Sequence, residues 1–467
     1  MSEVSEVTLF RKVNIFDGEN EQLLEGYDVL VVKNLIKEIG KDIEIADSYE
    51  IDVKTGGLKE MHTHGDICNI TGAGHKVVTV YEPEKNVTKE VTVQIIDGAG
   101  RTLIPGLIDA HWHTTYAYTP PSVYFGGQGD ILEVAILGMR GAEATLMRGF
   151  TTVRDPGGNS FAIKKLIDSG EFPGHRILPS GPFMSQTGGH ADFRDNNDLP
   201  VNPTDPLTYW EKHYVAMVAD GVPEVTKRSR EILRHGATQI KITTGGGVSS
   251  LYDPLDVFEY TMDEIRAIVE VAENWNTYVL SHVMNDKGVR KSVEAGVKSI
   301  EHGFFASEET LKLMKEKGAW LSPQPLLFED FNFTDPIQLK KLKQATDAVD
   351  ELYPKAKNIG VNIGFGTDQL FDPAAAANQG ALLARLGKWF TPYEVLKTAT
   401  SENARLLELA GPRHPYQEGP LGVVKEGAYA DLLLVDGNPL EDLDLVANPN
   451  ENFAIIMKDG KIYKNML

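Results

Sequence analysis

Hydrophobic and polar positions alternate in two different ways along this 467-residue chain. Near both ends, short β-branched runs are separated by Gly, Asn and Asp, which is typical of strands joined by turns. These runs cover residues 7–13, 27–32, 76–80, 430–435 and 454–457, and a turn-forming Asp459-Gly460 pair follows the last of them. We therefore expect one small β-sandwich domain, formed by residues 1–102 together with residues 413–467.

Between these ends, apolar runs alternate with amphipathic segments of helical period. Thr261 with Glu264 forms a capping box for a helix running towards Trp275, and Ser307 opens another helix that stops at Gly318. The apolar runs predict eight strands, which end near His113, Arg154, Ser180, Lys241, His282, His302, Ser322 and Asp368. Eight strands interleaved with helices over residues 103–412 predict a (β/α)8 TIM barrel, a fold of about 250 residues before insertions.

Polar side chains stand at the expected ends of several of these buried strands. The run 102–113 ends in His111 and His113, and residues two apart on a strand point to one side. The other such residues are Lys241, His282, His302 and Asp368. Buried lysine and aspartate are costly unless they are paired or bind metal, and barrel active sites lie at the carboxyl ends of the strands. The pattern therefore predicts a metal site.

Lys241 admits two interpretations, because an ammonium cannot bind a cation. Its amine could react with carbon dioxide to give an anionic carbamate that bridges two metals, or it could pair with Asp or Glu in the barrel core. The single cysteine, Cys68, excludes a thiolate ligand set and an internal disulfide. Imidazole and carboxylate ligands make zinc the first candidate, with manganese, iron, cobalt and nickel as alternatives.

Bulk composition limits the classes of partner. No run of eighteen apolar residues is present and the N-terminus is acidic, so we expect neither a membrane span nor a signal peptide. The formal net charge is −21 without a basic stripe, which argues against nucleic acid. We expect a cytoplasmic protein that acts on a small molecule.

Three further residues are candidate substrate contacts. His190 ends a Gly-rich loop and could contact the substrate or only the backbone, and Tyr252 follows the loop 245–247. Arg154 could bind a substrate carboxylate or pair with a neighbouring aspartate. A second His-x-His, at His62 and His64, does not follow an apolar strand, and we expect a surface feature there.

The six candidate ligands together resemble the binuclear branch of the amidohydrolase superfamily. The segments 184–192, 398–404 and 427–439 are similar to Xaa-Pro dipeptidase-like and imidazolonepropionase-related members. The resemblance implies two divalent metals. It implies that His111, His113 and Asp368 hold one metal, that His282 and His302 hold the other, and that N-carboxylated Lys241 bridges them. It also implies that Asp368 transfers a proton and that the protein forms a homo-oligomer.

The resemblance leaves the substrate open. A dipeptide or N-acyl amino acid is the first expectation, and a lactam, lactone, carbamate or aryl urea is the alternative. A deaminase fits less well, because such relatives lack the strand-four lysine. A scaffold protein also fits less well, because scaffold relatives have typically lost metal ligands and all six are present here. Tyr, Phe and Pro in the loops 116–125, 183–197, 249–259 and 324–333 predict an apolar or aromatic part in the substrate. The segment 55–95 is longer than the resemblance predicts.

Overall fold

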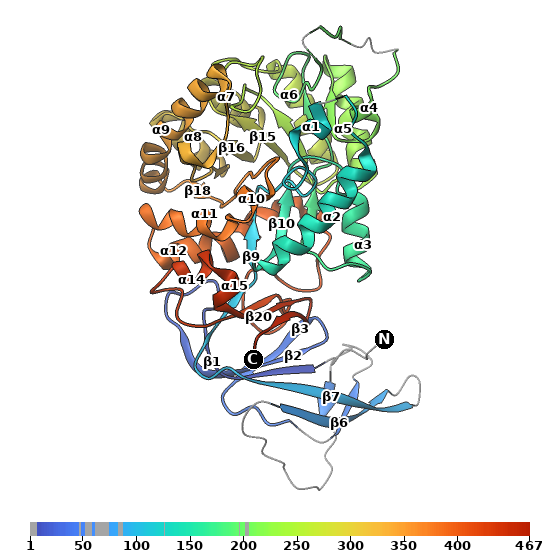
Figure 1. Ribbon diagram of the computed structural model, residues 1–467, viewed down its shortest axis with the longest axis vertical. Helices are drawn as coiled ribbons and strands as arrows, with labels where there is room; N and C mark the ends of the chain where they lie inside the picture. The colour runs from blue at the N-terminus through green and yellow to red at the C-terminus, as the bar shows by residue number, and fades with distance from the viewer. Residues whose placement is uncertain are drawn as a thin grey trace. The chain divides into compact units, whose positions relative to one another are not determined.

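The computed structural model describes residues 7–45, 48–51, 58–60, 74–82, 87–125, 127–195, 197–200 and 205–467. Contacts divide the chain into two compact units, Met1–Leu107 with Tyr416–Leu467, and Ile108–Pro415 (Figure 1). His62, His64 and Cys68 lie outside the described residues. Of the helices in the described part, none is long and apolar enough to cross a membrane.

The smaller unit is a β domain that draws strands from both ends of the chain. Its strands are β1 (Val7–Ile15), β2 (Leu24–Val32), β3 (Leu35–Gly40), β4 (Ser48–Ile51), β5 (Leu58–Glu60), β6 (Gly74–Glu82), β7 (Val87–Asp97), β8 (Thr102–Pro105), β19 (Leu432–Val435), β20 (Phe453–Lys458) and β21 (Lys461–Asn465). They form one hydrogen-bonded network, with β2 and β3 branching from β1, where we expected two separate sheets. A buried cluster from both chain ends includes Phe10, Leu103, Leu434 and Ile455.

The larger unit alternates parallel strands with helices. Its strands are β9 (Leu107–Asp109), β10 (Phe150–Asp155), β11 (Arg176–Pro179), β12 (Phe183–Ser185), β13 (Ala216–Val218), β14 (Ile240–Thr243), β15 (Val279–Val283), β16 (Ser299–His302), β17 (Trp320–Ser322) and β18 (Asn362–Ile363). They pair in the orders β11-β10-β9 and β13-β12-β14-β15-β16-β17-β18. Figure 1 shows the helices arranged around these strands.

Helices of the larger unit begin and end at recognisable signals. They are α1 (Pro121–Phe125), α2 (Ile131–Met147), α3 (Phe161–Asp168), α4 (Tyr209–Lys212), α5 (Val222–His235), α6 (Met262–Asn274), α7 (Asp286–Ala295), α8 (Glu308–Lys317), α9 (Pro336–Ile359), α10 (Pro373–Ala376), α11 (Gln379–Arg385), α12 (Pro392–Lys397) and α13 (Asn403–Leu407). The predicted capping box of Thr261 with Glu264 is present at α6, and the Thr261 side chain accepts from the Glu264 amide. Ser307 caps α8, which stops at the left-handed Gly318, as predicted.

Hydrogen bonds join the carboxyl ends of β9 and β18. The Ala110 amide donates to the Phe365 carbonyl over 2.9 Å. Asn403 donates from its amide nitrogen to the carbonyls of Ile108, at 2.7 Å, and Phe365, at 2.8 Å. Asn403, from the segment 398–404, therefore holds the two strand ends together.

One strand prediction was wrong in its extent. Residues 102–113 are not a single strand, because the first strand, β8, ends before Gly106 and a second strand, β9, with different neighbours, begins after it. β8 pairs with β19 in the smaller unit, whereas β9 lies beside β10 in the larger unit and ends at Asp109. His111 and His113 thus lie in the loop after the strand, and Asp368 lies in the loop after β18.

Candidate metal centre and cavity

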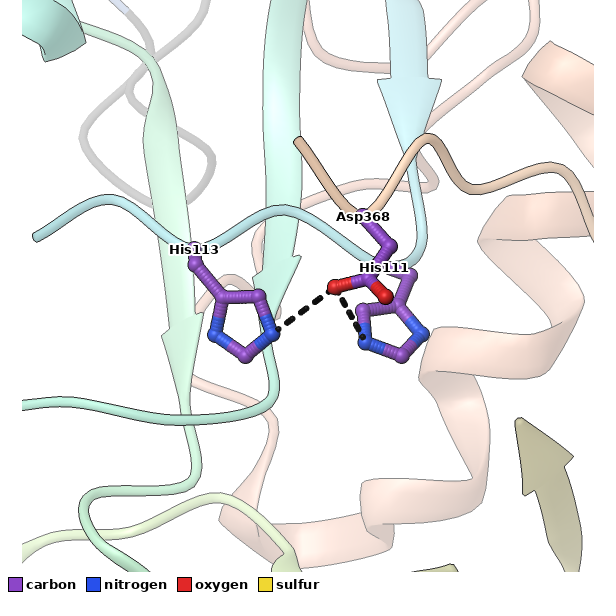
Figure 2. Close-up of side chains that lie close together, drawn as sticks. All are labelled: His111, His113 and Asp368. Carbon is purple, nitrogen blue, oxygen red and sulfur yellow. Dashed lines mark ion pairs between the residues drawn. The ribbon is translucent and has the colours of Figure 1, made fainter. Parts of the chain in front are cut away.

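Three predicted ligands form a compact cluster. Nε2 of His111 lies 3.3 Å from Oδ1 of Asp368, and Nε2 of His113 lies 3.2 Å from the same oxygen. Figure 2 shows the carboxylate between the two imidazoles, reaching them from a different segment of chain. One ligand atom from each residue lies within 4.8 Å of the others. Two nitrogens and an oxygen at this spacing fit a divalent cation such as zinc.

The other three predicted ligands line the same cavity. Nε2 of His302 lies 3.9 Å from Oδ2 of Asp368, and the rings of His302 and His282 are 4.4 Å apart. Lys241, on β14, lines the cavity with a side chain that is almost fully buried. The structure therefore brings all six side chains of the predicted set around one cavity.

Lys241 has an unusual environment for a lysine. No described residue forms a hydrogen bond or an ion pair with its ammonium, although the residue is only 3% exposed. Burial lowers the pKa of the Lys241 amine to about 8, against the attraction of Glu301 and Asp368. A buried, unpaired ammonium is unfavourable. The lowered pKa makes the neutral amine, the form that adds carbon dioxide, easier to reach at neutral pH than it is for an ordinary lysine.

The imidazoles of His282 and His302 are held in the neutral form that binds metals. Burial and the neighbouring His190 lower the pKa of His282 well below its usual value. Burial also lowers the pKa of His302 to about 3. Nδ1 of His302 lies 2.6 Å from Oε1 of Gln324, which fixes the tautomer and leaves Nε2 free to face Asp368.

Glu301 orients the His111 ring from the buried side. Its Oε2 lies 2.7 Å from Nδ1 of His111, and its Oε1 lies 2.7 Å from a guanidinium nitrogen of Arg154. Against the cost of burial, Arg154 and His111 hold the pKa of Glu301 far below its usual range. A carboxylate behind a metal-ligating histidine fixes the ring and raises its basicity. The sequence placed Glu301 on the strand but gave it no role.

The prediction for Arg154 as a substrate contact is corrected by this pairing. Arg154 is fully buried below the cavity. Besides Glu301, its guanidinium donates to the Ala110 carbonyl and to Oγ of Ser299. With these partners the guanidinium supports the ligand histidine, and Arg154 does not line the cavity in which a substrate would bind.

Asp109 ties together the two loops that carry the His111–His113–Asp368 cluster. Its Oδ1 accepts from the amides of His111, at 3.0 Å, and Thr367, at 3.2 Å. Its Oδ2 accepts from the Thr367 hydroxyl, at 2.7 Å, and from Nε2 of Gln379, at 2.8 Å. Oε1 of Gln379 in turn accepts from the Arg148 guanidinium. We call the contacts that run from Asp109 through Gln379 to Arg148 the Asp109 relay. Its sequence signal is Asp109 itself, two residues before His111, which the sequence analysis did not single out.

Backbone strain and close packing mark the segments that carry the ligands. His302, at the end of β16, and Asp368 have φ values of 72° and 51°, a region that residues with side chains rarely adopt. A Cβ added to Gly366 would lie 2.4 Å from Cβ of His111. Strain of this kind is maintained by surrounding structure and is concentrated at functional sites. The loops are therefore shaped around the ligand cluster.

His190 lies above the ligands. Its ring stacks on that of His282 with centroids 4.0 Å apart, and its Nδ1 lies 2.8 Å from Asp253. Its backbone amide donates to Glu259 over 2.8 Å. Burial raises the pKa of Glu259 to about 7. With Nδ1 bound by Asp253, Nε2 of His190 is the nitrogen that can meet a substrate. Tyr252 lines the same cavity and is 59% exposed.

The cavity above these ligands measures about 660 Å³. This volume falls in the range of small-molecule sites, which are mostly apolar with a few placed polar groups. Phenylalanine side chains from several segments of the chain line the cavity, including Phe125 of α1, Phe183 of β12, and Phe193, Phe304 and Phe371.

Comparisons with known proteins identify the family of this chain. The model of the amidohydrolase family matches residues 102–467. An ochratoxinase of Aspergillus niger is 32% identical over 389 residues, which cover 78% of this chain and 75% of that protein. A crystal structure of a prolidase complexed with N-methylphosphonate-L-proline superposes with a TM-score of 0.81 at 31% identity, covering 98% of this chain and all of the other.

A third relative is a Xaa-Pro dipeptidase with bound methionine in the active site. Its crystal structure superposes with a TM-score of 0.72 at 26% identity and covers 98% of this chain and all of that one. The resemblance inferred from the ligand pattern is thereby confirmed. The chain belongs to the amidohydrolase family and is a metal-binding hydrolase that acts on amide bonds.

Proposed function

We propose that this protein is a binuclear metal-dependent hydrolase on a (β/α)8 barrel, and that it cleaves the amide bond of a dipeptide or an N-acyl amino acid. The observation that carries the proposal is the convergence of four imidazoles and one carboxylate around the buried, unpaired amine of Lys241. In a site with one metal such a lysine has no ligand role, whereas in a site with two metals its carbamate can bridge the cations.

The donor set divides between two metals. His111, His113 and Asp368 would hold the first, and His282 and His302 would hold the second. Lys241, N-carboxylated, would bridge them with its two carbamate oxygens. Two bound divalent ions, zinc being the first candidate, would lower the pKa of a bound water and polarise the scissile carbonyl.

Asp368 would transfer the proton, and His190 would position the substrate. Oδ1 of Asp368 lies between two imidazoles, where it can take a proton from the attacking water and pass it to the leaving nitrogen. Water oxygen joins the carbonyl carbon, the C–N bond breaks, and the amine leaves with the transferred proton. Nε2 of His190 would donate a hydrogen bond to the substrate carbonyl or carboxylate, and Tyr252 would contact the substrate from the loop of Ser250, which packs against His190.

Hydrolysis of a substrate panel tests the proposal. Xaa-Pro dipeptides, Xaa-Arg dipeptides and N-acyl amino acids are incubated with the metal-loaded protein, and the released amine is quantified. We expect cleavage of at least one class, abolished by Asp368→Asn. Cleavage of lactams, carbamates or aryl ureas alone would replace the proposed substrate and retain the site. Cleavage of nothing by protein with two metals per chain would contradict the proposal.

A further inference from the structure

The two imidazoles proposed for the first metal are oriented by different partners. His111 has the carboxylate of Glu301 at its Nδ1, whereas Nδ1 of His113 lies 3.1 Å from the carbonyl oxygen of Gly157. A carbonyl oxygen only accepts, so Nδ1 of His113 carries the proton, and Nε2, which lies 3.2 Å from Oδ1 of Asp368, keeps its lone pair. The tautomer of this ligand therefore depends on where the Gly157 carbonyl lies.

Asp155 places this carbonyl through a turn that we name the Asp155 turn, residues 155–158. Asp155 is the last residue of β10 and is fully buried. Its Oδ1 accepts from the Gly157 amide over 3.2 Å, so the side chain bonds the backbone two residues on and closes the chain over Pro156. The Ser180 amide donates to the Asp155 carbonyl over 2.8 Å, which ties the start of the turn to the end of the neighbouring strand β11.

The Asp155 turn is packed closely against the ligand ring. A Cβ added to Gly157 would collide with the Phe183 ring and would lie 3.1 Å from Cε1 of His113. Gly158 has a φ of 103°, which residues with side chains rarely adopt, and a Cβ there would collide with the Thr115 hydroxyl. Because so little space remains, a shift of the turn would be transmitted to the ring of His113.

We propose that Asp155 is a positioning residue for the first metal. Its carboxylate closes the Asp155 turn, the turn presents the Gly157 carbonyl to Nδ1 of His113, and the carbonyl holds the tautomer whose Nε2 can bind a cation. Asp155 acts through the backbone, since it does not line the cavity. The inference rests on the proposed donor set and adds how one of its members is held.

Two replacements separate the hydrogen bond of Asp155 from the shape of its side chain. Asp155→Leu keeps the approximate shape without an acceptor. Asp155→Asn keeps an acceptor for the Gly157 amide, and the neighbouring Ser160 hydroxyl can accept from the new NH2 group. In zinc competition with a chromophoric chelator, we expect Asp155→Leu to weaken the binding of one ion about 10–100-fold and Asp155→Asn to remain close to the wild type. Asp347→Leu, at an exposed carboxylate, is the matched control.

The tautomer of His113 can be read directly in the metal-free protein. Long-range proton–nitrogen NMR correlations at mildly alkaline pH, with His113→Asn to assign the signal, should show the proton on Nδ1 in the wild type and in Asp155→Asn. In Asp155→Leu we expect a mixture of the two tautomers. A general loss of stability would not change this signal in the folded protein, so the signal distinguishes positioning from a structural role.

A proton on Nε2 of His113 in the wild type, or an unchanged zinc affinity in Asp155→Leu, would overturn the inference. Equal losses in Asp155→Asn and Asp155→Leu would assign the effect to the carboxylate charge and would overturn the role of the turn. If Asp155→Leu does not fold, the tautomers of the wild type and of Asp155→Asn decide. A wild type that binds no zinc would contradict the proposed function, whereas the tautomer, which is read without metal, would still test Asp155.

Discussion

The four hydrogen bonds of Asp109 make a quantitative prediction about how the ligand loops are held. Asp109→Asn keeps the shape of the side chain and the two contacts of Oδ1 with the amides of His111 and Thr367. It places an NH2 group against Nε2 of Gln379, which donated to the carboxylate over 2.8 Å. The Thr367 hydroxyl can rotate and accept from the new amide, but two N–H donors remain face to face.

The magnitude follows from that geometry. A lost hydrogen bond to a charged group costs about 1.5–3 kcal/mol, and a buried donor left without an acceptor costs about 1–3 kcal/mol. The free energy of unfolding should therefore fall by about 2.5–6 kcal/mol. Because the same side chain anchors the loops of His111 and Asp368, metal should be lost at a chelator concentration that the wild type tolerates.

Gln379→Glu in the same protein should restore what Asp109→Asn removes. A carboxylate at position 379 accepts from the new amide at 109 and pairs with Arg148, whose guanidinium already lies 3.1 and 3.3 Å from Oε1 of Gln379. Urea unfolding followed by circular dichroism measures the stabilities, and elemental analysis measures bound metal. Asp347→Asn, which alters an exposed pair with Lys343, is the control.

The double variant should recover at least half of the loss in the free energy of unfolding and in bound metal. Unchanged stability and metal content in Asp109→Asn, or a double variant that adds the penalties of both changes, would refute the role assigned to the relay.

Three other substitutions probe separate parts of the site. Glu301→Gln removes the carboxylate behind His111 and should lower metal affinity about 10–100-fold in a chelator competition, whereas the exposed Glu308→Gln should not change it. Burial raises the pKa of Glu259 in the folded protein to about 7, so between about pH 4.5 and 7 the folded state holds a proton that the unfolded state has released. The free energy of unfolding therefore falls by about 3 kcal/mol as pH rises through this range. Glu259→Gln should remove this dependence, which urea unfolding at pH 5 and pH 8 measures. Gly366→Ala drives a methyl group into His111 and should reduce metal content, and full occupancy by elemental analysis would contradict it.

The sequence predicted the alternation of parallel strands and helices in the larger unit because the signals for it are local, whereas the pairing of the strands into two sheets was not predicted. The capping box at Thr261 and the glycine stop at Gly318 each depend on a few neighbouring residues, and both are present. Lys241, on a β-branched run, was identified through the cost of burying an ammonium. The break at Gly106 was missed because both halves of the run 102–113 are apolar, although the pair Pro105-Gly106 is a local turn signal; β8 then pairs with β19 and leaves β9 to the larger unit.

The support around the ligands was not predictable from the sequence. Arg154 and Glu301 are 147 residues apart, and nothing in either local segment shows that the guanidinium turns inward to the carboxylate instead of outward to a substrate. The relay from Asp109 to Gln379 spans 270 residues in the same way. Which side chains become partners depends on which strand ends lie side by side. That arrangement is a property of the tertiary structure and cannot be seen in either local segment.

The most direct test of the binuclear centre is the number of metal ions per chain, measured by elemental analysis in protein purified without chelator, with Lys241→Ala beside the wild type. We predict two ions per chain in the wild type and loss of most of them in Lys241→Ala, because the bridge between the ions is removed. One ion per chain in the wild type, or two ions retained after Lys241→Ala, would contradict the bridged centre.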